Sequence, residues 1–223
     1  MQKYFPAIAV TTLLAAATAA SALPPAPAHV RGSIASLKGQ DLTVTTATGP
    51  VHVHLTQPVN VATVIRSSRA AIKPGSFVGI TSIILPNGSQ RATEIHVFPE
   101  SMRGSGEGSR DWDWPGSGGK RSRMTNGTVS AGNAPRPKSR MTNGTVSGAA
   151  GASSLTLQFK SPTGTGSQGI IIPPGIPVVT FDKGSAADLK PGVRVFVIGA
   201  KGPGNTVSAA RIVAGKNGVA PPM

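Results

Sequence analysis

Cysteine is absent from this chain of 223 residues. The absence excludes a thiolate nucleophile, a disulfide bridge and a zinc–thiolate site. Aromatic residues are also scarce, with two Trp, one Tyr and six Phe. A core with so few large rings is typical of small β-barrels filled by Val, Ile and Leu.

Acidic residues are few, with 8 Asp and Glu against 22 Lys and Arg, which gives a formal net charge of +14. Such a charge favours anionic partners, among them nucleic acid, acidic polysaccharide and lipid headgroups. A basic cluster at 120–140 (Lys120, Arg121, Arg123, Arg136, Lys138 and Arg140) suits phosphate or sulfate groups, with a solvated linker as the alternative. The alternative is that the charge serves only to keep a Gly-rich protein in solution.

Long apolar runs are missing except at the N-terminus, where residues 5–20 follow Lys3 and precede Ala20-Ser21-Ala22. This layout is typical of a secretory signal peptide, so we expect residues 1–22 to be removed after Ala22. A retained membrane anchor is the alternative, but Pro6 and several Thr dilute the run. We therefore expect a periplasmic or secreted protein with no membrane span after cleavage, for which nucleic acid is an unlikely partner.

One β-pattern occurs twice, in residues 30–98 and again in residues 144–213. Both copies contain a Lys-Pro-Gly step before a strand, at 73–75 and at 190–192. A repeat of this length indicates two related folded units and not a solenoid, whose repeats run to about 20–50 residues. Each unit is small and has no disulfides, so we expect the two units to pack on each other.

Alternation of apolar and polar residues predicts the strands of the first copy, at 32–37, 41–47, 51–56, 76–84 and 90–98. A short helical turn at 68–72 is expected to stop at Lys73-Pro74-Gly75, because the residue before proline avoids the α region. Three strands, a short helix and two strands match the order of the OB-fold, a five-stranded barrel. The fold class predicted is therefore all-β, with two OB-like five-stranded barrels in tandem. A β-sandwich is the alternative.

The expected organisation is a Pro/Ala tether at 23–29, an OB-like domain at 30–100 and a Gly/Ser/Arg-rich flexible linker at 101–138. A second OB-like domain at 139–218 and a tail at 219–223 follow. The segment SRMTNGTVS occurs twice, at 122–130 and at 139–147. Only one copy can be the first strand of the second barrel. The later copy is preferred because it needs a shorter loop to reach Leu155.

Four segments carry a resemblance to a known family: 94–100 (EIHVFPE), 103–108 (RGSGEG), 112–113 (WD) and 141–143 (MTN). With the duplicated barrel pattern, they resemble a family of small exported bacterial proteins of unknown function. Some members of that family carry the label "metal ABC transporter permease". The resemblance covers nearly the whole mature chain and implies paired OB-like domains. A histidine follows the Gly-Glu-Gly step in the family, whereas Ser109 stands here, so any metal or acid–base role of that histidine is missing.

Three histidines are the candidate metal ligands. His52 and His54 share one face of a strand, and in an OB order the fifth strand would bring His96, with Glu94, toward that face. Imidazole nitrogens and a carboxylate on adjacent strands suit a divalent cation. The alternative is that all three are ordinary outward polar positions.

The linker holds the second candidate site, formed by Trp112 and Trp114 with Arg110 and Asp113. Aromatic residues in a Gly-rich loop either dock between domains or receive a ligand such as a sugar ring or a lipid. The carboxylates Glu107, Asp111 and Asp113 would be needed for hydrolysis of acidic envelope sugars, a more distant alternative.

These patterns together predict a non-enzymatic, exported binding or envelope-accessory protein, with an anionic envelope component or another protein as partner. The second hypothesis is a periplasmic protein that binds a divalent metal through the three histidines. No other cofactor is expected, and no catalytic residues are assigned.

Overall fold

The computed structural model describes residues 26–130, 154–162 and 164–221. Its regular elements are twelve β-strands and four short 3₁₀ helices, and the strands form one hydrogen-bonded sheet. No helix within these residues is long and apolar enough to cross a membrane. The strands are β1 (Pro27–Lys38), β2 (Asp41–Thr46), β3 (Gly49–Arg66), β4 (Phe77–Ile84), β5 (Gln90–Val97), β6 (Gly108–Trp112), β7 (Ser122–Val129), β8 (Ser154–Ser161), β9 (Gly164–Ile171), β10 (Val178–Lys183), β11 (Arg194–Lys201) and β12 (Thr206–Gly215). The 3₁₀ helices are η1 (Arg69–Ala71), η2 (Glu100–Met102), η3 (Pro115–Ser117) and η4 (Ala186–Asp188).

The all-β prediction is confirmed, and the alternation of residue types placed the early strands correctly. In β2 and β3 the side chains of Leu42, Val44, Val53 and Leu55 are buried, while the intervening polar positions face outward. Strand β1 starts earlier than expected, because Pro27 to His29 extend it along β11. Residues 27–29 of the expected 23–29 tether therefore belong to the sheet.

A closed five-stranded barrel is built from β1, β2, β3, β12 and β11, and we call it the first barrel. Antiparallel ladders join neighbours around it, and a parallel ladder between β3 and β12 closes it. Small and medium aliphatic side chains fill its interior, among them Ile34, Val44 and Ile212. None of the described residues in this core cluster is aromatic, which agrees with the low aromatic content of the sequence.

The remaining barrel-like part, which we call the second unit, consists of β4, β5, β7, β8 and β9, with β6 along the free edge of β7. Antiparallel pairing runs from β5 through β4, β7 and β8 to β9. Two parallel residue pairs, Gln90 with Ile170 and Arg91 with Ile171, then bring β9 back to β5. A separate aliphatic core that includes Ile80, Ile95 and Leu157 lies inside.

The two repeats exchange their last two strands. The β11–β12 hairpin belongs to the second repeat and completes the barrel begun by β1 to β3, and the β4–β5 hairpin joins β7 to β9. Equivalent contacts show the exchange at atomic level: Gly192 N donates to Ile34 O and Gly75 N donates to Val129 O, each at 2.8 Å. Both glycines follow a Lys-Pro step, and their φ angles are positive, +83° at Gly192 and +85° at Gly75. This backbone conformation favours glycine.

This exchange corrects the expectation that 30–100 and 139–218 each fold as a separate barrel. The physical reason is that the two repeats have the same alternation and the same turns, so each hairpin fits either set of three strands. The strand pairing also differs from that of a β-sandwich with two stacked sheets, because all twelve described strands belong to one sheet.

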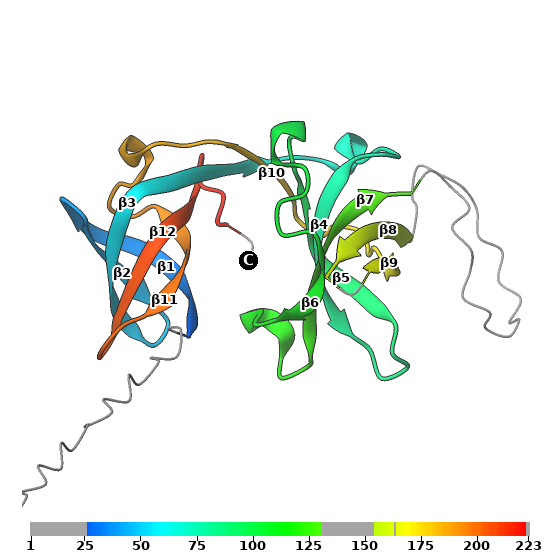
Figure 1. Cartoon of the computed structure of the whole chain (residues 1–223), viewed down its shortest axis with the longest axis horizontal. Helices are drawn as coiled ribbons and strands as arrows, with labels where there is room; N and C mark the ends of the chain where they lie inside the picture. Colours follow the sequence, from blue (N-terminus) through cyan, green and yellow to red (C-terminus); the bar gives the residue numbers. More distant parts are fainter. Residues whose placement is uncertain (1–25, 131–153, 163, 222–223) are drawn as a thin grey trace, which may run out of the picture.

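Two strands cross between the parts and hold them together (Figure 1). The second half of β3 pairs with β10 from Ala62–Lys183 to Arg66–Val179, and β10 also lies parallel to β5. In the second repeat, Pro173-Pro174-Gly175 interrupts the matching strand and separates β9 from β10. A third apolar cluster, containing Phe181, Phe196 and Val64, packs at this bridge. The two parts thus pack on each other, as expected, and this third apolar cluster lies between them.

The earlier copy of the duplicated segment forms a strand, β7, which pairs with β4, β6 and β8. The preference for the later copy is therefore corrected, and residues 139–147 lie outside the described residues. A flexible linker at 101–138 is corrected as well, since β6 and β7 fall within it. Loop closure favoured the later copy by only a small amount, about 0.6 kcal/mol for each doubling of loop length.

Candidate ligand-binding cleft

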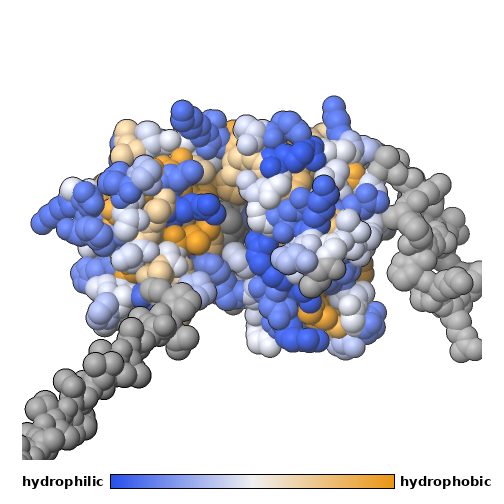
Figure 2. Space-filling model, in the orientation of Figure 1, coloured by the Kyte–Doolittle hydropathy of each residue, from blue (hydrophilic) through white to orange (hydrophobic). Residues whose placement is uncertain are grey.

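A cleft of about 700 Å³ lies where the first barrel and the second unit meet. Both parts contribute to its walls, together with the crossing strands β3 and β10. Its volume is in the range of pockets that hold small organic ligands, about 300–1,000 Å³. Figure 2 shows apolar side chains reaching the surface beside the boundary between the two parts.

Aromatic rings form much of the wall. Phe98 and Phe181 are stacked with their centroids 4.9 Å apart, and Phe196 approaches Trp112 at 6.2 Å. These rings come from the loop after β5, from β10, from β11 and from β6, so the aromatic residues that the barrel cores lack are gathered here. The wall therefore offers flat apolar surfaces for a ring or a hydrocarbon chain.

Two buried polar atoms at the cleft have no hydrogen-bond partner among the described residues, Asn126 Oδ1 and Trp112 Nε1. Asn126 is 5% exposed and its amide nitrogen donates to Ser105 O at 3.1 Å. Asn126 Oδ1 can occupy its position only because residue 79, opposite on β4, is glycine. A Cβ at Gly79 would come within 2.6 Å of this oxygen. A buried acceptor without a partner costs about 1–3 kcal/mol, which a bound donor would recover.

Three cations lie around the cleft, Arg110 on β6, Lys183 on β10 and Arg211 on β12. None of them has an ion-pair partner among the described residues, and Asp182 is the one carboxylate in the lining of this cleft as described. Arg110 lies over the Trp112 ring at 5.6 Å and donates to Gly106 O at 2.7 Å. Desolvation there lowers the pKa of Arg110, although a guanidinium stays charged at neutral pH.

A buried polar pair stands behind the wall. Glu94 Oε1 and His96 Nε2 are 3.2 Å apart on the same face of β5, and both side chains are almost fully buried. Thr81 donates to Glu94 at 2.9 Å, and the edge of His96 packs on Phe181. His96 reaches the cleft lining, so this pair gives the aromatic wall a fixed polar support.

The predicted metal site is not assembled. Because β12 takes the place next to β3, His52 and His54 lie opposite Thr206 and Ser208, while His96 lies in the second unit. His54 Nδ1 is 3.0 Å from Asp41 Oδ1, and both side chains are more than half exposed. The described part of the chain contains no group of three or more His, Asp or Glu residues that could hold a metal ion.

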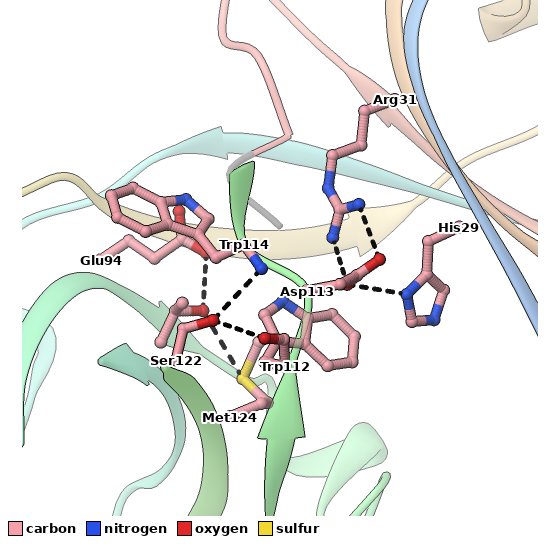
Figure 3. Close-up of polar contacts among 9 residues, drawn as sticks. His29, Arg31, Glu94, Trp112, Asp113, Trp114, Ser122 and Met124 are labelled. Carbon is pink, nitrogen blue, oxygen red and sulfur yellow. Dashed lines mark hydrogen bonds and ion pairs between the residues drawn. The ribbon is translucent and has the colours of Figure 1, made fainter. Parts of the chain in front are cut away.

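The linker residues of the second predicted site separate into two places. Trp112 packs on His29 at 4.8 Å, and Asp113 accepts hydrogen bonds from Arg31 and from His29, each at 2.9 Å (Figure 3). These contacts join β6 to β1 of the first barrel. Burial raises the pKa of Asp113, but the bonds from Arg31 and His29 outweigh it and lower the pKa to about 2.

Trp114 points elsewhere and lines a smaller cavity of about 360 Å³ on the second unit. Pro173, Pro174 and Ile176 form the other side of that cavity. The two tryptophans are thus parts of different surfaces, although they are two residues apart.

The linker carboxylates each have their own partner. Glu107 accepts from Lys160 N at 3.0 Å, Asp111 lies 3.6 Å from Arg123, and Asp113 binds the first barrel. In the basic cluster, Arg136, Lys138 and Arg140 lie outside the described residues. The three carboxylates are therefore held by separate partners, and they do not form a pair that could act on one substrate.

Several cleft residues had no signal in the sequence. Asn126, Phe98 and Phe181 look like ordinary strand or loop positions, and Lys183 and Arg211 look like solvated charges. Only the strand exchange brings Arg211 on β12 and Arg110 on β6 into the lining of one cleft.

Part of the chain matches a known protein family. Residues 31–96 match a domain of unknown function, DUF5666. No curated protein and no solved structure matches the chain significantly. The matched range runs from β1 to β5, so it covers strands of both the first barrel and the second unit. The resemblance to a family of unknown function is therefore confirmed at this level, and the chain contains a DUF5666 domain over residues 31–96.

Proposed function

We propose that this is a non-enzymatic binding protein that holds a small ligand in the cleft between the first barrel and the second unit. The observation that carries the proposal is the unpartnered Asn126 Oδ1, which is buried in the lining of a 700 Å³ cleft with aromatic walls. A pocket that is mostly apolar, with a few convergent polar groups, is the usual form of a small-molecule site.

Export and the cleft belong to one proposal. The signal-peptide pattern at 1–22 supports a periplasmic or secreted location, where a basic protein meets anionic envelope components. The groups at the cleft suit recognition, because they supply flat surfaces, hydrogen-bonding atoms and fixed charges. A metal-binding function is not favoured by any observation on the described residues.

The test fills the cleft and measures uptake of a fluorescent apolar probe, N-phenyl-1-naphthylamine. Ala62 and Ser101 line the cleft, and replacing either by Phe should abolish the fluorescence rise that the wild-type protein gives. Ala210→Phe, an exposed change on β12 outside this lining, is the matched control and should bind as the wild type does. Equal probe binding by Ala62→Phe, Ser101→Phe and the wild type would overturn the proposal, provided that circular dichroism shows all variants folded.

A further inference from the structure

We infer that the ligand of this cleft is an organic anion with a flat apolar body, whose acidic group lies between Arg110 and Arg211. The inference rests on the proposed function and adds the chemical class of the ligand. A cleft lined by three cations and one carboxylate has an uncompensated positive field.

The cations come from three different elements and surround an apolar interior. Arg110 lies on β6 of the second unit, Arg211 on β12 of the first barrel and Lys183 at the end of the crossing strand β10. Like charges gathered without partners repel one another, and a bound anion relieves this repulsion. An exchanged fold that brings them together therefore favours a negatively charged ligand over a neutral one.

Two residues at one end of the cleft, Arg110 and Trp112, have N–H groups that can donate to an acidic oxygen of the ligand. Arg110 uses one of its five N–H groups on Gly106 O, and its guanidinium lies over the Trp112 ring, whose Nε1 has no acceptor among the described residues. An anionic oxygen at this point can accept from both residues. Such charge-assisted bonds are about twice as strong as bonds between neutral groups.

The acceptor for the rest of the ligand lies close by. A Cβ built on Gly106 would be 3.2 Å from Arg110 Nη2 and 3.3 Å from Asn126 Nδ2, so both side chains flank the same glycine. Asn126 Oδ1, which lies on the Gly79 side of the same amide, is the unpartnered acceptor of this side chain. The Phe98–Phe181 stack provides a surface for the apolar body.

The experiment compares two probes with the same ring system. 8-Anilinonaphthalene-1-sulfonate carries a negative charge and an N–H group, whereas N-phenyl-1-naphthylamine lacks the charge. The wild-type protein should bind the sulfonate about tenfold more tightly, a difference that salt reduces. Arg110→Gln and Arg211→Gln should each weaken sulfonate binding several-fold, and by more than they weaken binding of the neutral probe.

Arg194→Gln is the matched control, since Arg194 is exposed on β11 and does not line the cleft. Equal affinities for the two probes, or the same loss in Arg194→Gln as in Arg211→Gln, would overturn the anion inference while the binding function stands. Binding of neither probe, or binding that Ala62→Phe leaves intact, would instead overturn the proposed function.

Competition identifies the acid. 1-Naphthoate and 1-naphthyl phosphate have the same apolar body with different acidic groups. Displacement of the sulfonate probe by either one agrees with the inference, and the stronger competitor names the preferred group. Displacement by neither would overturn it.

Discussion

At the scale of single residues, Asp113 connects the two parts of the molecule. Its carboxylate accepts from the two terminal guanidinium nitrogens of Arg31, Nη2 at 2.9 Å and Nη1 at 3.2 Å, and from His29. Arg31 in turn lies over Phe196 at 4.8 Å, beside the ring of Trp112. One side chain in a connection between strands therefore fixes β6 against the first barrel and sets one wall of the cleft.

Replacement of Asp113 by Asn should lower the free energy of unfolding at pH 7 by about 1 kcal/mol. The depressed pKa alone corresponds to about 2 kcal/mol, and solvent screening at this half-exposed carboxylate reduces the effect. The folded pKa lies below the ordinary value of 3.8, so the contribution is full above pH 4 and is lost as the pH falls toward 2.

Urea unfolding of both proteins at pH 7 and at pH 2.5 checks this prediction. The difference between Asp113→Asn and the wild type should shrink at the lower pH. The control is Asp111→Asn, because Asp111 is exposed and lies 3.6 Å from Arg123, so its replacement should change little. A difference that stays constant with pH would contradict the assigned role of Asp113.

At the scale of elements, β7 is the most informative strand, because its sequence occurs twice. It pairs with β4 over seven residue positions and carries Asn126 into the cleft lining. Deletion cannot show which copy is used. Removing residues 122–138 and removing residues 131–147 give the same amino-acid sequence, since the two nine-residue segments are identical.

Substitution distinguishes the copies. Met124 is buried at 3% exposure, so Met124→Ala should lower the free energy of unfolding by about 2–5 kcal/mol. Met141→Ala, the same change in the other copy, should leave stability within about 0.5 kcal/mol of the wild type. Denaturant titration followed by circular dichroism measures both. If Met141→Ala is the destabilising change, the later copy forms the strand.

At the scale of the whole molecule, the exchange of hairpins makes each part depend on both repeats. The first barrel contains β11 and β12 from the second repeat, and the second unit contains β4 and β5 from the first. The crossing strands β3 and β10 and the apolar cluster around Phe181 belong to neither part alone. Separate unfolding of the first barrel would break the β3–β10 ladder and expose this shared cluster.

Thermal unfolding should therefore be a single cooperative transition. Circular dichroism, which follows all strands, and tryptophan fluorescence, which follows Trp112 at the contact with the first barrel and Trp114 on the second unit, should give the same midpoint. In calorimetry the measured enthalpy should equal the van't Hoff enthalpy. Two resolved transitions would show that the parts unfold independently and would contradict their coupling through β3, β10 and the shared cluster.

The sequence by itself determined many strands and turns of this protein, although not β6 and β7, which lie in the segment expected to be a flexible linker. Alternation in β2 and β3, the two Lys-Pro-Gly steps and the missing aromatic core all follow from local chemistry, because period-two burial and the backbone preferences of Pro and Gly act over a few residues. The partners of the strands were decided only by the tertiary structure. Two repeats with the same pattern allow each hairpin to close either barrel, and no local rule distinguishes the two arrangements. His52 and His96 were separated by that choice, and Arg110, Asn126 and Arg211 were brought to one cleft by it.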